Sequence, residues 1–269
     1  MPLGGTLNRI VGHYMKILAI GDIVGVRAIE HLRENLWKLR DKMGIDFVVA
    51  NGENATEIHG LSSSDAQKIL DTGVDLITMG NHTWAKRDLY AFLDANPEKI
   101  IRPANFPGSS PGYGYTIANV CGYRVLCMNA QGVSFMEPLA DPFETVEYIL
   151  AREEGEYDIS LLDFHAEATS EKYAMARVFD GKINLIFGTH THVPTSDLQI
   201  LPGGTAYVTD LGMTGPDNGI LGTDAERVLR KMRQHLPSQF IVANGNIRAD
   251  AVLFELDGTR VTKISRLKF

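Results

Sequence analysis

The sequence contains very few cysteines, and this scarcity excludes two classes of small protein. Only Cys121 and Cys127 occur among the 269 residues, and they form no Cys-x-x-Cys pair. A fold organised by disulfides or by a zinc finger is therefore excluded, because both need several cysteines at regular spacing. Low cysteine usage is typical of a reducing compartment, so we expect a cytoplasmic protein.

Long apolar runs are also missing. No stretch approaches the ~20 consecutive apolar residues that span a bilayer, so we expect no membrane partner. The first fourteen residues, MPLGGTLNRIVGHY, lack the apolar region of a signal peptide. The regular apolar pattern begins only at Met15. We therefore interpret residues 1–14 as a poorly ordered N-terminal extension.

An excess of basic residues is likewise absent. The chain has 26 Lys and Arg against 33 Asp and Glu, a formal net charge of −7. This balance argues against a broad basic surface for nucleic acid. A small anionic ligand is still compatible with it, because bound metal ions can reverse the local sign. No linker rich in glycine, proline or serine divides the chain, so we expect residues 15–269 to form a single domain.

The chain alternates short apolar runs with amphipathic stretches. Apolar positions spaced by three and four predict helices at 27–43, 62–72, 86–96, 142–153, 170–179 and 224–235. Short apolar runs predict strands at 16–20, 47–50, 74–79, 159–164 and 184–187. Paired runs predict hairpins at 114–129, 197–209 and 250–267. This order fits an α/β fold of two sheets with helices outside, one mostly parallel and one mostly antiparallel.

Five of the expected strands are followed by polar side chains that bind metals well. They are Asp22, Glu53, Asn54, Asn81, His82, His165, His190 and His192. Loops at the carboxyl ends of parallel strands lie along one edge, so these side chains are expected to converge. These side chains offer carboxylate, amide and imidazole groups and no thiolate. Such a set favours binding of Mn, Fe or Zn and argues against a structural zinc site.

The number of these residues exceeds the needs of one tetrahedral ion. It suits two ions about 3.5–4 Å apart, which can activate a bridging hydroxide and clamp a phosphate ester during displacement. Glu53 is the central candidate for a carboxylate that bridges the ions. His190 and His192 are two positions apart and can serve one ion each. His82 directly follows Asn81 and is placed to give a proton to a leaving oxygen.

Several motifs resemble those of one superfamily. Gly80-Asn81-His82 and Gly188–His192 resemble the GNH and GHTH-type motifs of calcineurin-like metallophosphoesterases. Together with NGEN at 51–54, RPANFP at 102–107, HAEATSEK at 165–172 and TDLGMTGP at 209–216, they resemble the YmdB-like branch over nearly everything from Met15 onward. The sequence Asp22-Ile23-Val24 departs from the Asp-x-His of the wider superfamily, as this branch does.

The resemblance implies a four-layer α-β-β-α sandwich and a site with two divalent or mixed-valence metal ions, Fe or Mn. One ion would be held by Asp22, Glu53, Asn54 and His192, and the other by Glu53, Asn81, His165 and His190. His82 would be the proton donor. The implied activity is a phosphodiesterase acting on a small phosphate ester, including cyclic nucleotides such as 2′,3′-cyclic AMP. A phosphomonoesterase with the same site, or a regulatory metal-binding protein with weak hydrolysis, are the alternatives, and a homo-oligomer is compatible with each.

A few further residues are interpreted as structural, solvated or supporting. The four remaining histidines are expected to be structural or solvated, namely His13, His31, His59 and His235. The loop of His59 follows Asn54 and could reach substrate, so its role stays open. The loop at Val133 lacks the basic residue that the resemblance suggests there. Glu167 is a candidate to support His165 from behind, and Asn51 is interpreted as a turn residue.

Overall fold

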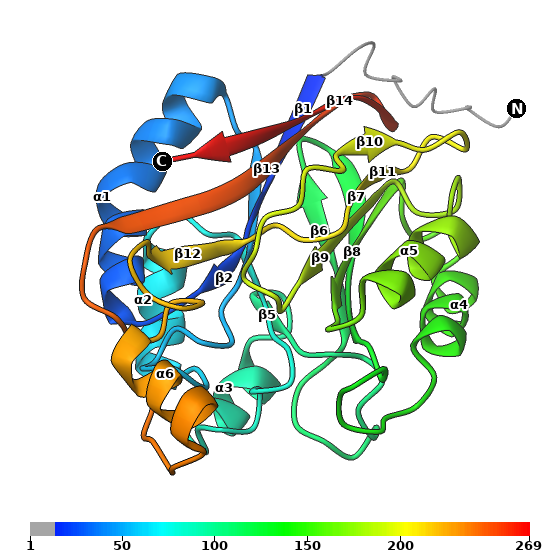
Figure 1. Cartoon of the computed structure of the whole chain (residues 1–269). Coiled ribbons are helices and arrows are strands. Elements are labelled where there is room, and N and C mark those ends of the chain that lie inside the picture. Colours follow the sequence, from blue (N-terminus) through cyan, green and yellow to red (C-terminus); the bar gives the residue numbers. More distant parts are fainter. Residues whose placement is uncertain (1–13) are drawn as a thin grey trace, which may run out of the picture.

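Two mixed β-sheets face each other, and helices cover both outer faces (Figure 1). The computed structural model describes residues 14–269. The extension expected at 1–14 lies outside the described residues except for Tyr14, which begins the first strand. That 15–269 form a single domain stays a prediction.

The first sheet has eight strands and the second has six. In spatial order the first contains β2 (Asp22–Ile23), β12 (Met213–Pro216), β13 (Ile247–Asp257), β1 (Tyr14–Ile20), β3 (Phe47–Asn51), β4 (Leu76–Thr78) and β5 (Ile100–Ile101), with β14 (Arg260–Lys268) paired to β13. The second contains β10 (Gln199–Ile200), β11 (Ala206–Val208), β9 (Leu185–Thr189), β8 (Ile159–His165), β7 (Tyr123–Gln131) and β6 (Tyr115–Val120).

Both sheets mix parallel and antiparallel pairs, so the prediction of one mostly parallel and one mostly antiparallel sheet was wrong. In the first sheet β1, β3, β4 and β5 are parallel, while β13 pairs antiparallel with β1. In the second, β7, β8, β9 and β11 are parallel, and antiparallel β6 and β10 flank them. The three predicted hairpins are present, but they divide between the sheets instead of forming one.

Alternation along the strands builds the layers. In β1, Leu18 and Ile20 point to the helix side, whereas Ile17 and Ala19 point into the space between the sheets. This is the two-residue period of a strand with both faces buried. A third apolar cluster lies on the outer face of the second sheet. Three cores separate four layers, which confirms the predicted α-β-β-α sandwich.

The six predicted helices are present, with ends that differ by up to three residues. α1 (Val26–Met43), α2 (Ser63–Asp71) and α3 (Leu89–Ala95) cover the first sheet, and α4 (Pro142–Arg152) and α5 (Thr169–Val178) cover the second (Figure 1). α6 (Ala225–Gln234) buries only Val228. Among residues 14–269, no helix combines the length and apolar composition needed to cross a bilayer.

Polar caps set several helix starts. The Ser62 hydroxyl accepts the Asp65 N–H at the start of α2. Asp141 accepts two N–H groups at the start of α4, where Pro142 occupies the first turn. Such caps satisfy N–H groups that have no partner within the helix. They fix where each helix begins and how the preceding loop approaches it.

We expect Leu32→Ala to lower the free energy of unfolding by about 2–5 kcal/mol, because it opens a cavity between α1 and the first sheet. Leu32 is 0% exposed. The matched control is Leu229→Ala in α6, where the side chain is 44% exposed and the change should stay within about 0.5 kcal/mol. Urea unfolding of both variants measures the difference, and equal effects would contradict this packing.

Candidate metal centre

The two sheets meet at a common edge, and the predicted metal ligands lie there. Asp22, Glu53, Asn54 and Asn81 follow or end strands of the first sheet, whereas His165, His190 and His192 come from β8 and the turn after β9 in the second. The prediction that these residues converge is confirmed. They do so across two sheets, and not along the edge of one.

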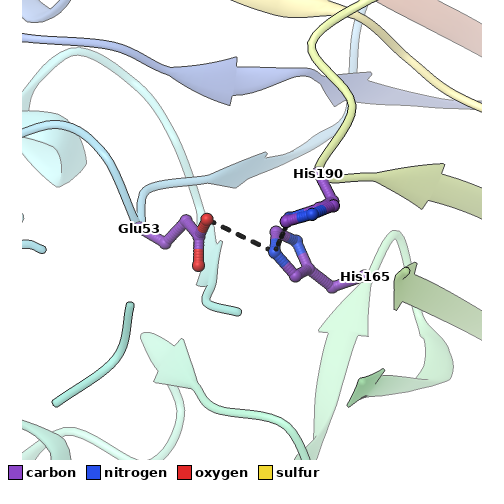
Figure 2. Close-up of side chains that lie close together, drawn as sticks. All are labelled: Glu53, His165 and His190. Atoms are coloured by element: carbon purple, nitrogen blue, oxygen red, sulfur yellow. Dashed lines mark hydrogen bonds and ion pairs between the residues drawn. The ribbon is translucent and has the colours of Figure 1, made fainter. Parts of the chain in front are cut away.

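The first group surrounds the His165 ring. Its Nε2 lies 2.9 Å from Oδ1 of Asn81, 3.1 Å from Nδ1 of His190 and 3.3 Å from Oε1 of Glu53. One ligand atom from each of Glu53, His165 and His190 lies within 4.8 Å of the others. Figure 2 shows these three side chains pointing toward one another from separate elements. Such a set of nitrogen and oxygen atoms has the size of a metal site.

The second group lies beside the first and contains Asp22, Asn54 and His192. His192 Nε2 lies 3.2 Å from Nδ2 of Asn54 and 3.8 Å from Oδ1 of Asp22. Asn54 Nδ2 also donates to Oε1 of Glu53 at 3.1 Å. Glu53 therefore contacts both groups, and its other oxygen, Oε2, accepts the His82 N–H at 2.9 Å.

Buried polar atoms without partners test whether this site fits a cation. Within the described part of the chain, Oδ1 of Asp22 and Oδ1 of Asn54 are buried and accept no hydrogen bond. An unpaired buried oxygen is costly, and a bound cation would remove that cost. A Cβ at Gly80 would collide with His165 Nε2 and Glu53 Oε2. Glycine is required there because a side chain would fill the space between the ligands.

The charges of the site also favour a bound cation. Burial raises the pKa of Asp22 to about 6. Burial disfavours a charged His165 ring, but the Glu53 carboxylate outweighs it and raises the pKa of His165 to about 9. The same ring, against the effect of burial, lowers the pKa of Glu53. Without a cation, the carboxylate charge is thus balanced by a proton on His165, which a metal ion would displace.

A chain of hydrogen bonds orients His165. Thr189 Oγ1 lies 2.6 Å from Oδ1 of Asp163 and 2.9 Å from Nδ1 of His165. The hydroxyl has one proton, which it donates to the carboxylate, so it is left to accept the Nδ1–H of the ring. Nε2 is then the nitrogen available to an ion. Sequence analysis missed both residues, because Asp163 reads as an ordinary position within a buried strand and Thr189 as a connecting residue before His190.

The turn that presents His190 and His192 is conformationally strained and held from behind. Both residues have positive φ, 95° and 63°, which is unfavourable for residues with a Cβ. Lys172 Nζ, from α5, donates to Asp210 Oδ2 at 2.7 Å and to the Thr189 carbonyl at 2.8 Å. Asp210 in turn accepts the Thr191 N–H at 3.2 Å. This buried ion pair ties the turn to the body of the protein.

A cavity of about 290 Å³ opens beside the site. Glu53, Asn54, His82, His190 and His192 are among the residues that line it. The His82 ring stacks on the His59 ring with centroids 4.1 Å apart. Burial lowers the pKa of both rings. His59 thus lines the cavity and is exposed there, so a solvated residue and one that reaches substrate both stay open.

Other minor interpretations have mixed outcomes. Glu167 Oε2 lies 3.1 Å from Nε2 of His190, so Glu167 supports that ring and not His165. Asn51 is more than a turn residue, because its buried side chain lies between Asp163 and the Glu53 N–H.

The remaining histidines and the Val133 loop lie apart from the cavity lining. His31 contacts the Phe269 carbonyl and His235 caps α6, as expected for structural residues, and His13 lies outside the described residues. The Val133 loop is held by Glu171, and its Phe135 is 91% exposed.

Comparison with known proteins gives a consistent result. The sequence profile of a family described as YmdB-like protein matches residues 18–267. The chain is 42% identical over 255 residues to the 2′,3′-cyclic-nucleotide 2′-phosphodiesterase of Bacillus subtilis (strain 168), covering 94% of this chain and 96% of that protein.

Two solved structures superpose closely on this fold. A hypothetical protein from Thermus thermophilus matches with a TM-score of 0.90 and 39% identity, covering 95% of this chain and 99% of that one. A structure described as a novel phosphatase from Mycoplasma pneumoniae matches with a TM-score of 0.90 and 32% identity, covering 96% and 94%.

We expect Thr189→Val to weaken metal binding by about 10- to 100-fold, because His165 Nδ1 loses the partner that orients the ring. The control is Thr205→Val. Thr205 is equally buried and its hydroxyl donates to the Ile183 carbonyl at 2.6 Å, in the loop before β11. Both variants should lose stability, since each leaves a buried polar group unpaired. Competition with a chelator measures Mn²⁺ affinity, and a similar loss in both variants would argue against an orienting role.

Proposed function

This chain belongs to the YmdB-like protein family, and from that premise we propose that it is a metal-dependent phosphodiesterase acting on a cyclic nucleotide such as 2′,3′-cyclic AMP. The observation that carries the proposal is the pair of groups that share Glu53, of which Asp22 and Asn54 each carry a buried side-chain oxygen without a hydrogen-bond partner. The 2′,3′-cyclic-nucleotide 2′-phosphodiesterase of Bacillus subtilis supports the substrate class.

The chemistry of the ligands favours two ions. Metallophosphoesterases use divalent metals, and we propose a dinuclear centre in which Glu53 is shared. Asp22, Asn54 and His192 would complete one set, and Asn81, His165 and His190 the other. Imidazole with carboxylate and amide oxygen suits Fe or Mn. When bound, such ions supply an acidified water for attack and offset negative charge on the phosphate.

The side chains of the site have three further roles, which are to hold charge, to position ligands and to donate a proton. Glu53 and Asp22 hold negative charge at the centre, and the Lys172–Asp210 pair keeps His190 and His192 in position. His82 lines the cavity without belonging to either ligand group, so it is the group placed to give a proton to the leaving ribose oxygen. Burial lowers its pKa, and the negative charge of a bound phosphate beside the ring would favour the protonated form.

A phosphomonoesterase is the second candidate, since the Mycoplasma pneumoniae structure is described as a phosphatase. Separate incubations with 2′,3′-cyclic AMP and with adenosine 3′-monophosphate, each with Mn²⁺, distinguish the two. A phosphodiesterase opens the cyclic diester and stops at adenosine monophosphate, whereas a phosphomonoesterase leaves the diester intact and releases inorganic phosphate from the monophosphate. Absence of turnover on either substrate would leave the regulatory metal-binding protein as the better description.

The dinuclear centre predicts a metal stoichiometry of two. Wild-type protein loaded with Mn²⁺ should retain two equivalents after desalting, as measured by elemental analysis. Glu53→Gln should lose both, because a shared carboxylate neutralises two cations. His192→Ala should retain the ion of the His165 group. One equivalent in the wild type, or two retained in Glu53→Gln, would refute the shared ligand.

The role of His82 predicts a dependence on the leaving group. His82→Ala should keep both ions and lose about 10²- to 10⁴-fold in rate on 2′,3′-cyclic AMP, whose ribose hydroxyl is a poor leaving group. With an acidic nitrophenol leaving group the loss should be smaller, since protonation matters less. His190→Ala is the contrasting variant and should lose metal and both activities. Equal losses on both substrates in His82→Ala would exclude a proton donor.

A further inference from the structure

The cavity beside the metal centre has a second wall that neither metal ligation nor proton transfer uses. Val24, Ile58, Leu221 and Phe240 line it, together with the Thr223 side chain. None of the four apolar side chains can bind a cation or a phosphate. They come from four separate segments of the chain and line the same 290 Å³ space as Glu53 and His82.

The Leu221 loop joins this wall to the ligands. Leu221 has a φ of 54°, a left-handed conformation that is costly for a residue with a branched side chain. Its carbonyl lies 3.0 Å from Nδ1 of His192, so it accepts that ring proton and leaves Nε2 for the site. Leu221 therefore contacts the His192 ring through its carbonyl and also lines the cavity.

Close packing keeps the wall in one piece. A Cβ on Gly222 would lie 2.8 Å from Cγ1 of Val24, so the loop sits directly on that residue. Val24 in turn forms a β-bridge with Asn54. Thr223 forms a bridge with Val242, which carries Phe240 two residues earlier. The apolar wall is therefore connected to the ligand groups through Val24 and Asn54.

One residue of this wall remains open to water. Leu221 remains 49% exposed although it lines a cavity. Leaving a large apolar side chain in water forfeits the free energy that its burial would contribute. A ligand with an apolar surface, bound at the metal centre by an anionic group, would cover it.

We propose that this wall is the subsite for the nucleobase of the substrate, an inference that rests on the proposed function. A nucleotide has an anionic phosphate at one end and a flat, largely apolar ring at the other. The cavity combines the same two kinds of surface, because the proposed ligands Glu53, Asn54 and His192 line it together with Leu221 and Phe240. The base packs against Phe240 and Leu221, and the sugar lies between base and phosphate, near the stacked rings of His59 and His82.

The decisive comparison uses two cyclic phosphodiesters, 2′,3′-cyclic AMP and glycerol 1,2-cyclic phosphate, which lacks a base. Phe240→Ala should lower the ratio of their kcat/KM values by about 5- to 150-fold, the effect of losing one base–aromatic contact. Leu221→Ala should lower it in the same direction. The matched control is Leu229→Ala, an exposed leucine of α6 outside this cavity, which should leave the ratio unchanged.

Adenosine alone provides a test that needs no turnover. It should bind the Mn²⁺-loaded wild type in calorimetry and compete with glycerol 1,2-cyclic phosphate, and Phe240→Ala should weaken both effects. If neither diester is cleaved while adenosine binding still depends on Phe240, the proposed function fails and the subsite stands. If both diesters are cleaved and the Phe240→Ala ratio equals that of the wild type, the function stands and the subsite is wrong. Absence of adenosine binding would likewise overturn it.

Discussion

The buried carboxylate of Glu53 is the interaction on which the site depends. It stands between side chains from opposite sheets, with the His165 ring and Asn54 on Oε1 and the His82 N–H on Oε2. Negative charge in such a place is unfavourable unless a positive group accompanies it. In the protein alone the His165 proton fills that role, and metal ions would fill it better. Position 80 is a glycine for the same reason, because a side chain there would fill the space between Glu53 and His165.

Residues around the site stabilise its strained backbone conformations. Positive φ angles occur at His190, His192 and Leu221, all within or beside the ligand groups. The buried Lys172–Asp210 pair and the Asp163–Thr189 hydrogen bond compensate by fixing the turn and the His165 ring. Removing either partner of a buried ion pair leaves an unpaired charge. Stability and function are therefore coupled here through residues that never contact substrate.

The apolar wall extends this organisation to the ligand. The His192 ring and the Leu221 carbonyl share one short contact, so the position of this proposed metal ligand and the shape of the cavity are set together. Under the proposed subsite, a relative with a different loop at 219–223 should differ in substrate preference while keeping its metals.

The sequence by itself determined the local elements and singled out the residues that we propose as metal ligands. Apolar periodicity located the helices and hairpins, and polar residues directly after strands marked these candidates, because both signals are carried by neighbours in the chain. It did not reveal that the hairpins divide between two sheets, that His59 stacks on His82, or that Asp163 and Thr189 orient His165. Only the tertiary structure decided these points. Pairing between distant strands, and hydrogen bonds between side chains from separate elements, depend on which surfaces pack together, and no local pattern encodes that choice.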